Sequence, residues 1–307
     1  MDADLVYFDD PNDTYSSLPD DSVSSGNVSD NVVFGISILV ICIFGAVGNG
    51  IVIWLLGFRI KRNPFSTYIL NLAVADFGVL LAATFFVADY WVGFIYDTPI
   101  IFFVFFFLFL STYSSSQFLL TAISLDRCVA VFFPLWHRCH RPPHLSTIVC
   151  ALIWVLVLFF LLTAVTCTLK SVRLHVSIIE ESYQFIVNAV LCLPVMTIAT
   201  VSLFIKACLK ARQHRRGRLL TVILLTLLFF LLFAFPFNIM HILTNLIYLP
   251  IYMSSGALLL ACLNSSINPV IYFLVGRQWK SSHREGMKMI LQKVFKEEEG
   301  CVEETTV

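Results

Sequence analysis

The sequence has few charged side chains and no cysteine pattern typical of a metal site. Only 13% of its 307 residues are Asp, Glu, Lys or Arg, whereas 58% are hydrophobic and Phe alone occurs 29 times. A soluble domain needs a more polar surface than this, so the composition favours a membrane protein. The nine cysteines include no CxxC pair and no Cys/His pair at zinc spacing, which argues against a cysteine-bound metal.

Motifs of common catalytic sites are also missing. There is no His/Glu pairing at metal spacing, no GxSxG and no phosphate-binding loop, so we expect neither an enzyme nor a cofactor. Internal repeats and multiple intramembrane charges, which are typical of transporters, are not evident either. A small-solute transporter is therefore the less favoured alternative to a signalling protein.

The first 31 residues contain eight Asp and no Lys or Arg, unlike a cleavable signal peptide. Their polar composition predicts a disordered, acidic, extracellular tail over 1–31. Two sequons within it, beginning at Asn12 and Asn27, are the predicted glycosylation sites.

Long uncharged runs predict helices that cross the membrane, because a span needs about 20 apolar residues. The final run, 219–276, would form one helix of about 87 Å, so it must turn back, and Pro250 places the turn near 247–253. Residues 32–276 are therefore predicted to form an all-α bundle of seven transmembrane helices. The runs are 32–58, 65–88, 98–125, 145–169, 182–205 and the divided 219–276.

Basic residues set the orientation, since translocated loops avoid Lys and Arg. Of the 20 Lys and Arg residues, 18 fall on one side of the predicted spans and only Lys170 and Arg173 fall on the other. This asymmetry places the N-terminus outside and the C-terminus in the cytoplasm. Apolar residues at helical spacing then predict an amphipathic cytoplasmic helix over 277–296, followed by a tail over 297–307. Cys301 in this tail is a candidate for palmitoylation, and a plain free thiol is the open alternative.

Asp76 is the one ionisable group placed clearly in the middle of a span, where charge is costly and usually functional. Polar residues at comparable depth predict a pocket that holds a small cation or waters. A hydrogen-bonded clamp between helices without an ion stays open as the alternative. The polar residues are Asn49, Ser116, Asn264 and Asn268.

At the cytoplasmic end of the third span, Asp126 is positioned to hold the adjacent Arg127 until another group recruits it. Taken alone, this pair would be interpreted as ordinary flanking charge. Prolines at 194, 236 and 269 predict kinks where spans five, six and seven pivot.

In combination, these features resemble the rhodopsin-like G protein-coupled receptors, in one order over residues 32 to 296. The motifs are Gly48-Asn49, Leu72-Ala-Val-Ala-Asp76, Asp126-Arg127-Cys128, Trp154, Pro194, Pro236 and Asn268-Pro269-Val270-Ile271-Tyr272.

Within that class the chain is most similar to the Mas-related receptors. The segment 63–68 (NPFSTY) and the loop 134–144 (PLWHRCHRPPH) carry this likeness. Two departures from the wider class agree with it. Ala234 stands where most members have Trp, and Phe102 stands where most have a disulfide cysteine.

The resemblance implies a plasma-membrane receptor that activates a heterotrimeric G protein and also binds arrestin. It implies a sodium site, acting as a negative allosteric modulator, at Asp76, Ser116, Asn264 and Asn268. It further implies a switch in which Arg127 meets the G protein and Tyr272 swings toward the same cavity. The switch residues are Asp126, Arg127, Pro236, Asn268, Pro269 and Tyr272. Because Arg216 occupies the foot of span six, Asp126 alone is left to hold Arg127.

The outer side is acidic, which favours a cationic ligand such as a basic peptide or an amine. Family members that bind basic peptides and amines use a pair of acids at the outer ends of spans four and five. By resemblance, Glu180 matches the acid of span five, whereas Ala164 occupies the position of the acid in span four. Glu180 and Glu181 as solvated loop charges are the alternative. Separately, several of the candidate lining residues in spans three and six are expected to satisfy only one another. No extracellular disulfide is expected. The candidate ligand contacts are Glu180, Glu181, Asp89, Tyr113, Gln117, Asn238 and His241.

The sequence thus predicts a G protein-coupled receptor for an extracellular cationic ligand. A decoy receptor of the same fold but without G protein output is the nearest alternative.

Overall fold

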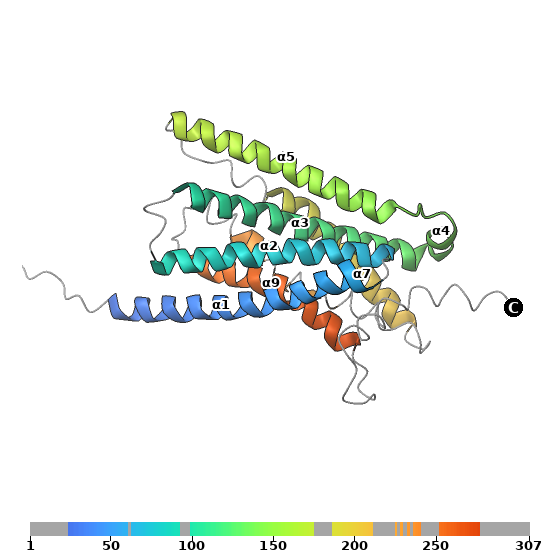
Figure 1. Ribbon diagram of the computed structural model, residues 1–307. Coiled ribbons are helices and arrows are strands. Elements are labelled where there is room, and N and C mark those ends of the chain that lie inside the picture. Colours follow the sequence, from blue (N-terminus) through green and yellow to red (C-terminus); the bar gives the residue numbers. More distant parts are fainter. Residues whose placement is uncertain are drawn as a thin grey trace, which may run out of the picture.

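The computed structural model describes residues 24–60, 63–92, 99–174, 186–210 and 252–276, with 225, 228–229, 232–233 and 236–240 between the last two segments. Near several helix ends it describes the backbone alone. Every regular element in this part of the chain is a helix (Figure 1). These are α1 (Ser24–Trp54), η2 (Leu55–Arg59), α2 (Pro64–Val92), α3 (Pro99–Phe132), α4 (Pro134–Cys139), α5 (Leu145–Leu174), η4 (Asn188–Cys192), α7 (Leu193–Lys210) and α9 (Tyr252–Gly276).

Six of these helical segments are long and apolar enough to cross a membrane, which confirms an all-helical membrane protein with multiple spans. The span expected early in the 219–276 run is described only at scattered residues. The predicted cytoplasmic helix 277–296 and the tail 297–307 lie outside the described residues. The six segments are Val32–Arg59, Pro64–Ala88, Phe103–Phe132, Leu145–Thr166, Asn188–Lys206 and Gly256–Phe273.

Helix α1 begins at Ser24, so its first eight residues extend into the segment 1–31 that was predicted to be disordered. A helix nucleated by an apolar span propagates at little cost, since each further residue adds one backbone hydrogen bond. The polar composition that suggested disorder over 24–31 is therefore compatible with helix.

The predicted irregularity in span five is a π-turn, η4, which ends two residues before Pro194. Proline lacks an N–H and its ring crowds the carbonyl four residues earlier, so a widened turn relieves that clash. A second π-turn, η2, ends the first span, where Ile60 N donates to the Leu55 carbonyl at 2.9 Å.

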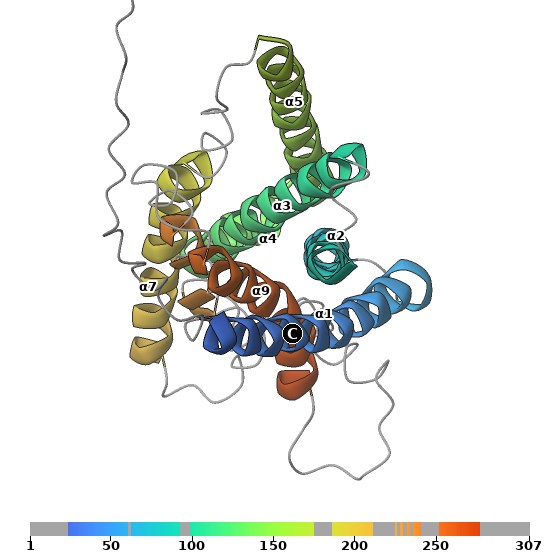
Figure 2. The ribbon, with the colours of Figure 1, turned by 90° about the vertical axis from the view of Figure 1, so that its left-hand side faces the viewer.

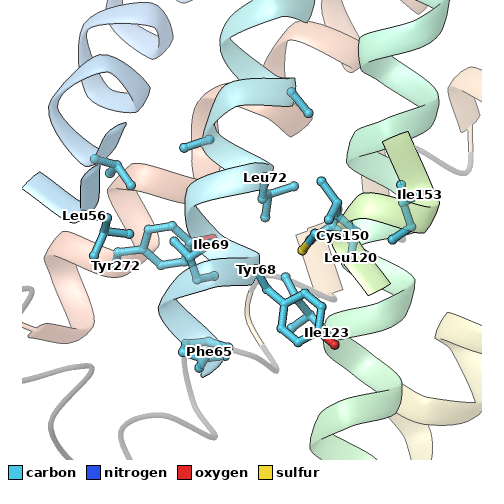
Figure 3. Packing of buried hydrophobic residues seen from close by; sticks show 14 of the residues in the cluster. Leu56, Phe65, Tyr68, Ile69, Leu72, Leu120, Ile123, Cys150, Ile153 and Tyr272 are labelled. Carbon is cyan, nitrogen blue, oxygen red and sulfur yellow. The ribbon is translucent and has the colours of Figure 1, made fainter. Parts of the chain in front are cut away.

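Helix α3 is central, with contacts to α2, α5 and α7, while α1 packs on α2 and α9. Figure 2 shows α5 on the outer side of α3, away from α1 and α9. The largest apolar cluster joins α2 and α3 to η2, α5, α7 and α9, and Figure 3 shows part of it. Tyr113 and Phe237 belong to a second cluster, and Cys42 and Cys262 to a third.

Candidate functional site

One buried carboxylate joins three helices in the centre of the bundle. The Asp76 side chain of α2 is fully buried. Its Oδ1 accepts a hydrogen bond from Ser116 Oγ of α3 at 2.7 Å, and its Oδ2 accepts one from Asn268 Nδ2 of α9 at 2.8 Å. The structure therefore brings together three of the four residues predicted for a cation pocket.

The fourth, Asn264, is buried one helical turn before Asn268. No described protein group accepts a hydrogen bond from its Nδ2. Ser265, which sequence reasoning missed, is fully buried beside it, and its carbonyl accepts a hydrogen bond from Asn49 Nδ2 at 3.0 Å. Asn49 also donates to the Gly45 carbonyl, so its amide clamps α1 to α9.

The donor set of this centre suits a weakly held alkali cation better than a transition metal. It offers one carboxylate together with hydroxyl and amide oxygens, which are hard ligands. Among the described residues no three His, Cys, Asp or Glu side chains converge. The Asn264 Nδ2 has no acceptor among the described groups. Rotating this amide by 180° would place its oxygen at that position, where it could bind a cation. The residues therefore fit a sodium ion.

At the cytoplasmic end, the predicted ion pair between Asp126 and Arg127 is present, with Nη2 and Oδ2 2.9 Å apart. The Asp126 carboxylate is shared. Arg141 Nη2 lies 2.7 Å from its other oxygen and also donates to Ser146 Oγ at 2.8 Å. The three charged side chains are only 5–9% exposed, which makes these bonds stronger than surface pairs.

Arg141 reaches Asp126 because the loop between α3 and α5 folds back on itself. Pro134 starts the single-turn helix α4, and a turn that bonds Leu145 N to the Pro142 carbonyl then begins α5. Sequence reasoning did not assign Arg141 a role. Its basic charge in the loop was the available signal, but the charge alone could not identify its acidic partner.

Arg127 is also covered from the side of α2. Its guanidinium carbon lies 4.4 Å from the centre of the Phe65 ring, a cation–π contact. Figure 3 shows the Tyr272 ring between Leu56 of η2 and Ile69 of α2, in the same cluster as Phe65. Arg127 and Tyr272 are therefore both enclosed, at 4% and 2% exposed.

Three of the candidate ligand contacts form a buried network of their own. Asn238 Nδ2 donates to Tyr113 Oη at 3.1 Å and to Gln117 Oε1 at 3.4 Å, and all three residues are completely buried. Phe237 packs edge-on against Tyr113, with 4.7 Å between ring centres. In this conformation the network links α3 to span six within the bundle interior.

Two further polar bonds tie helices together. Asn188 of η4 donates to Ser114 of α3 at 2.9 Å, a pair that sequence reasoning missed. Trp154 Nε1 donates to Asn71 Oδ1 at 3.0 Å and joins α5 to α2, which gives that motif residue a packing role.

Most of the remaining predicted sites are outside the described side chains. Asn12, Glu180, Glu181, His241 and Cys301 lie outside the described residues, and for Asn27 and Asp89 the backbone alone is described. Pro236 begins a short described helical segment and Pro269 lies inside α9.

Comparisons with known proteins place this geometry in a family. The family model for the 7 transmembrane receptor (rhodopsin family) matches residues 48–272. The Proto-oncogene Mas of Rattus norvegicus is 34% identical over 274 residues, which are 83% of this chain and 81% of that protein. The Mas-related G-protein coupled receptor member A2B of Mus musculus is 37% identical, over 88% of this chain and 92% of that protein. The Mas-related G-protein coupled receptor member D of Homo sapiens is 38% identical, over 84% of this chain and 83% of that protein.

The family match over residues 48–272 includes Asp76, Arg127 and Tyr272. The chain belongs to the rhodopsin family of seven-transmembrane receptors, among the Mas and Mas-related members: it is a multi-pass plasma-membrane receptor that signals through G proteins, and not an enzyme.

Proposed function

We propose that this receptor binds a basic peptide or a cationic amine at its extracellular side and passes the signal to a heterotrimeric G protein through Arg127. The charge distribution carries the ligand half of the proposal. The outer segments hold Asp89, Asp97, Glu180 and Glu181 besides the eight Asp of residues 1–31, against Lys170 and Arg173. Such a field attracts cations and raises their local concentration.

The buried network of Tyr113, Gln117 and Asn238 supports a route from ligand to cytoplasm. Most of the class has a Trp at the position of Ala234, so a bulky ring is missing there. Phe237 and Asn238, three and four residues later, instead contact Tyr113 of α3 by ring packing and hydrogen bonding. Movement of span six by a ligand would therefore pull directly on α3, which carries the Asp126–Arg127 pair near its cytoplasmic end.

The cytoplasmic surface beside that pair suits a protein partner. Leu135 and Trp136 on α4 are 75% and 46% exposed, and Phe133 just before them is 65% exposed. Large exposed apolar side chains on a cytoplasmic loop that also carries Arg141 are typical of a binding surface. A G protein is the expected occupant, and arrestin is expected to compete for the same surface.

G protein dissociation, measured by energy transfer in cells, tests the function directly. The receptor is expressed with each Gα class in turn and challenged with a panel of basic peptides and of amines. We expect at least one Gα class to dissociate above the level of cells without receptor. If no class responds to any compound and basal output is also absent, the receptor is a decoy.

Glu180→Ala tests the acidic site. We expect the half-maximal concentration of a cationic agonist to rise about threefold to tenfold, because one partly solvated ion pair is lost. Lys170→Ala removes a charge of the opposite sign from the same outer side, so it should lower the half-maximal concentration or leave it unchanged. Surface expression is measured alongside. An unchanged half-maximal concentration in the Glu180 variant would show that this acid is only a solvated loop charge.

The Asp76 centre is proposed as a sodium site that stabilises the resting receptor. In purified receptor, replacing N-methylglucamine chloride by sodium chloride should raise the melting temperature by about 2 °C, as expected for an ion at about tenfold its dissociation constant. Asp76→Asn keeps an acceptor for Ser116 but removes the charge, so the sodium effect should disappear. A sodium-dependent shift that survives in Asp76→Asn would place the ion elsewhere. A wild-type receptor without any shift would favour the ion-free clamp.

A further inference from the structure

Two thiols on different helices are in contact inside the bundle. Cys42 Sγ of α1 donates a hydrogen bond to Cys262 Sγ of α9, with 3.6 Å between the sulfur atoms. Both side chains are completely buried. Their surroundings are apolar, formed by Ile38, Leu80, Ala83 and Val87.

This pairing is distinctive among the six cysteines whose side chains the structure describes. Cys139 is exposed and Cys150 lies within the large apolar cluster. Cys128 Sγ is directed to the Ala199 carbonyl at 3.7 Å. Only the contact between Cys42 and Cys262 brings two of these sulfurs together.

We propose that Cys42 and Cys262 are a modification site, at which oxidation forms a reversible disulfide between α1 and α9. A disulfide needs a sulfur–sulfur distance of about 2.05 Å, so the two sulfurs must approach by about 1.5 Å. Helices α1 and α9 are packed against each other, and modest side-chain rotations can supply that approach. The sequence predicted no extracellular disulfide and gave no sign of this pair, whose members are 220 positions apart.

The oxidant belongs to the class of small uncharged peroxides, which can enter a buried apolar site. One thiol loses its proton, and its sulfur attacks a peroxide oxygen. The O–O bond breaks, a sulfenic acid forms and one water leaves. The second thiol then attacks the sulfenic sulfur, the disulfide bond forms and a second water leaves. Two thiols and one hydrogen peroxide thus give one disulfide and two waters, and a dithiol reductant reverses the change.

The crosslink would restrain the helix that carries the receptor's central polar residues. Cys262 precedes Asn264 by two positions and Asn268 by six, and Cys42 lies two turns from the Asn49 clamp. An oxidised receptor would therefore have α1 and α9 joined both at this site and at that clamp. The effect on signalling rests on the proposed function, whereas formation of the bond does not.

Peptide mapping tests the bond itself. Membranes that contain the wild-type receptor are treated with hydrogen peroxide, remaining thiols are blocked with N-ethylmaleimide, and the protein is digested without reductant. Mass spectrometry should find one peptide pair joined through Cys42 and Cys262, which dithiothreitol separates. Recovery of these cysteines only as blocked or singly oxidised peptides would overturn the proposal. This measurement needs no variant and no G protein.

Thermal unfolding of the purified receptor gives an independent readout. Because the bond closes a loop of more than 200 residues, peroxide should raise the melting temperature by about 5 °C or more. Cys42→Ser and Cys262→Ser should each lose this shift, while Cys150→Ser, another buried thiol, should keep it. If a serine variant does not fold, the alanine variant replaces it. A shift that persists without Cys262 would contradict the assignment.

Discussion

The Arg127→Ala receptor is expected to reach the cell surface and yet to lose at least nine-tenths of its maximal G protein response. Arg127 is the cation at the cytoplasmic end of α3, enclosed between Asp126 and the ring of Phe65. Once the cytoplasmic side opens, the planar guanidinium of Arg127 can donate several hydrogen bonds to the G protein, whereas an alanine side chain can donate none. G protein dissociation at matched surface expression measures the loss.

The structure also explains why this variant should fold. Removing one member of a buried ion pair usually leaves a costly lone charge. Here Asp126 keeps Arg141, whose Nη2 lies 2.7 Å from its carboxylate. Arg127→Lys should recover only part of the signal, because it restores the charge without the fork geometry.

Arg141→Ala is the matched control, since it removes an arginine from the same carboxylate. The Asp126–Arg127 bond at 2.9 Å is left in place, so the response should remain well above that of Arg127→Ala. Equal responses from wild type and Arg127→Ala would refute a transducing role for Arg127. Equal losses in both arginine variants would mean that the local charge network, and not Arg127 itself, is required.

Gly45→Val is expected to prevent correct assembly of the bundle. A Cβ at Gly45 would meet Ser266 Oγ of α9, with Ser266 Cβ at 2.7 Å and Leu80 Cδ1 of α2 at 2.9 Å. Because α2 and α9 both pack against this point, α1 would have to shift away from both helices to make room. Small residues allow such close approach between membrane helices. One added methyl group costs about 1–3 kcal/mol in a packed interior, and valine adds more.

We expect the Gly45→Val receptor to melt about 5–10 °C below wild type, or to be retained inside the cell. Gly50→Val serves as the control on the same helix, since nothing lies within 4 Å of a Cβ there. Ser266→Ala should partly rescue Gly45→Ala by removing the nearest atom. Similar melting temperatures for the two valine variants would show that the contact at Gly45 is not tight.

Much of the fold was predictable because the membrane imposes simple rules on sequence. Apolar length indicated the spans, and six described segments agree with the predicted runs. Asp76 was identifiable because a charge within a span is rare and costly. Its partners Ser116 and Asn268 were identifiable because they lie at similar depth on other spans.

The contacts missed by sequence reasoning depend on how helices rotate and how loops turn. Arg141 reaches Asp126 only because α4 and the following turn reverse the chain. For Tyr113, Gln117 and Asn238 the sequence left two outcomes open, pocket lining or bonds to one another, and in the structure they bond to one another in the interior. Side-chain type cannot distinguish these outcomes, because the same polar groups serve either purpose.

By itself, the sequence determined the class of the molecule, the positions of most of its spans and the depth of its polar residues, and it predicted the orientation of those spans. Those properties follow from hydrophobicity and charge, which are summed along the chain. Only the tertiary structure decided which groups touch: Asp126 with Arg141, Asn49 with the Ser265 carbonyl, and Cys42 with Cys262. Such pairings are set by helix packing over distances of a few ångströms, and residues 220 positions apart carry no local signal of their meeting.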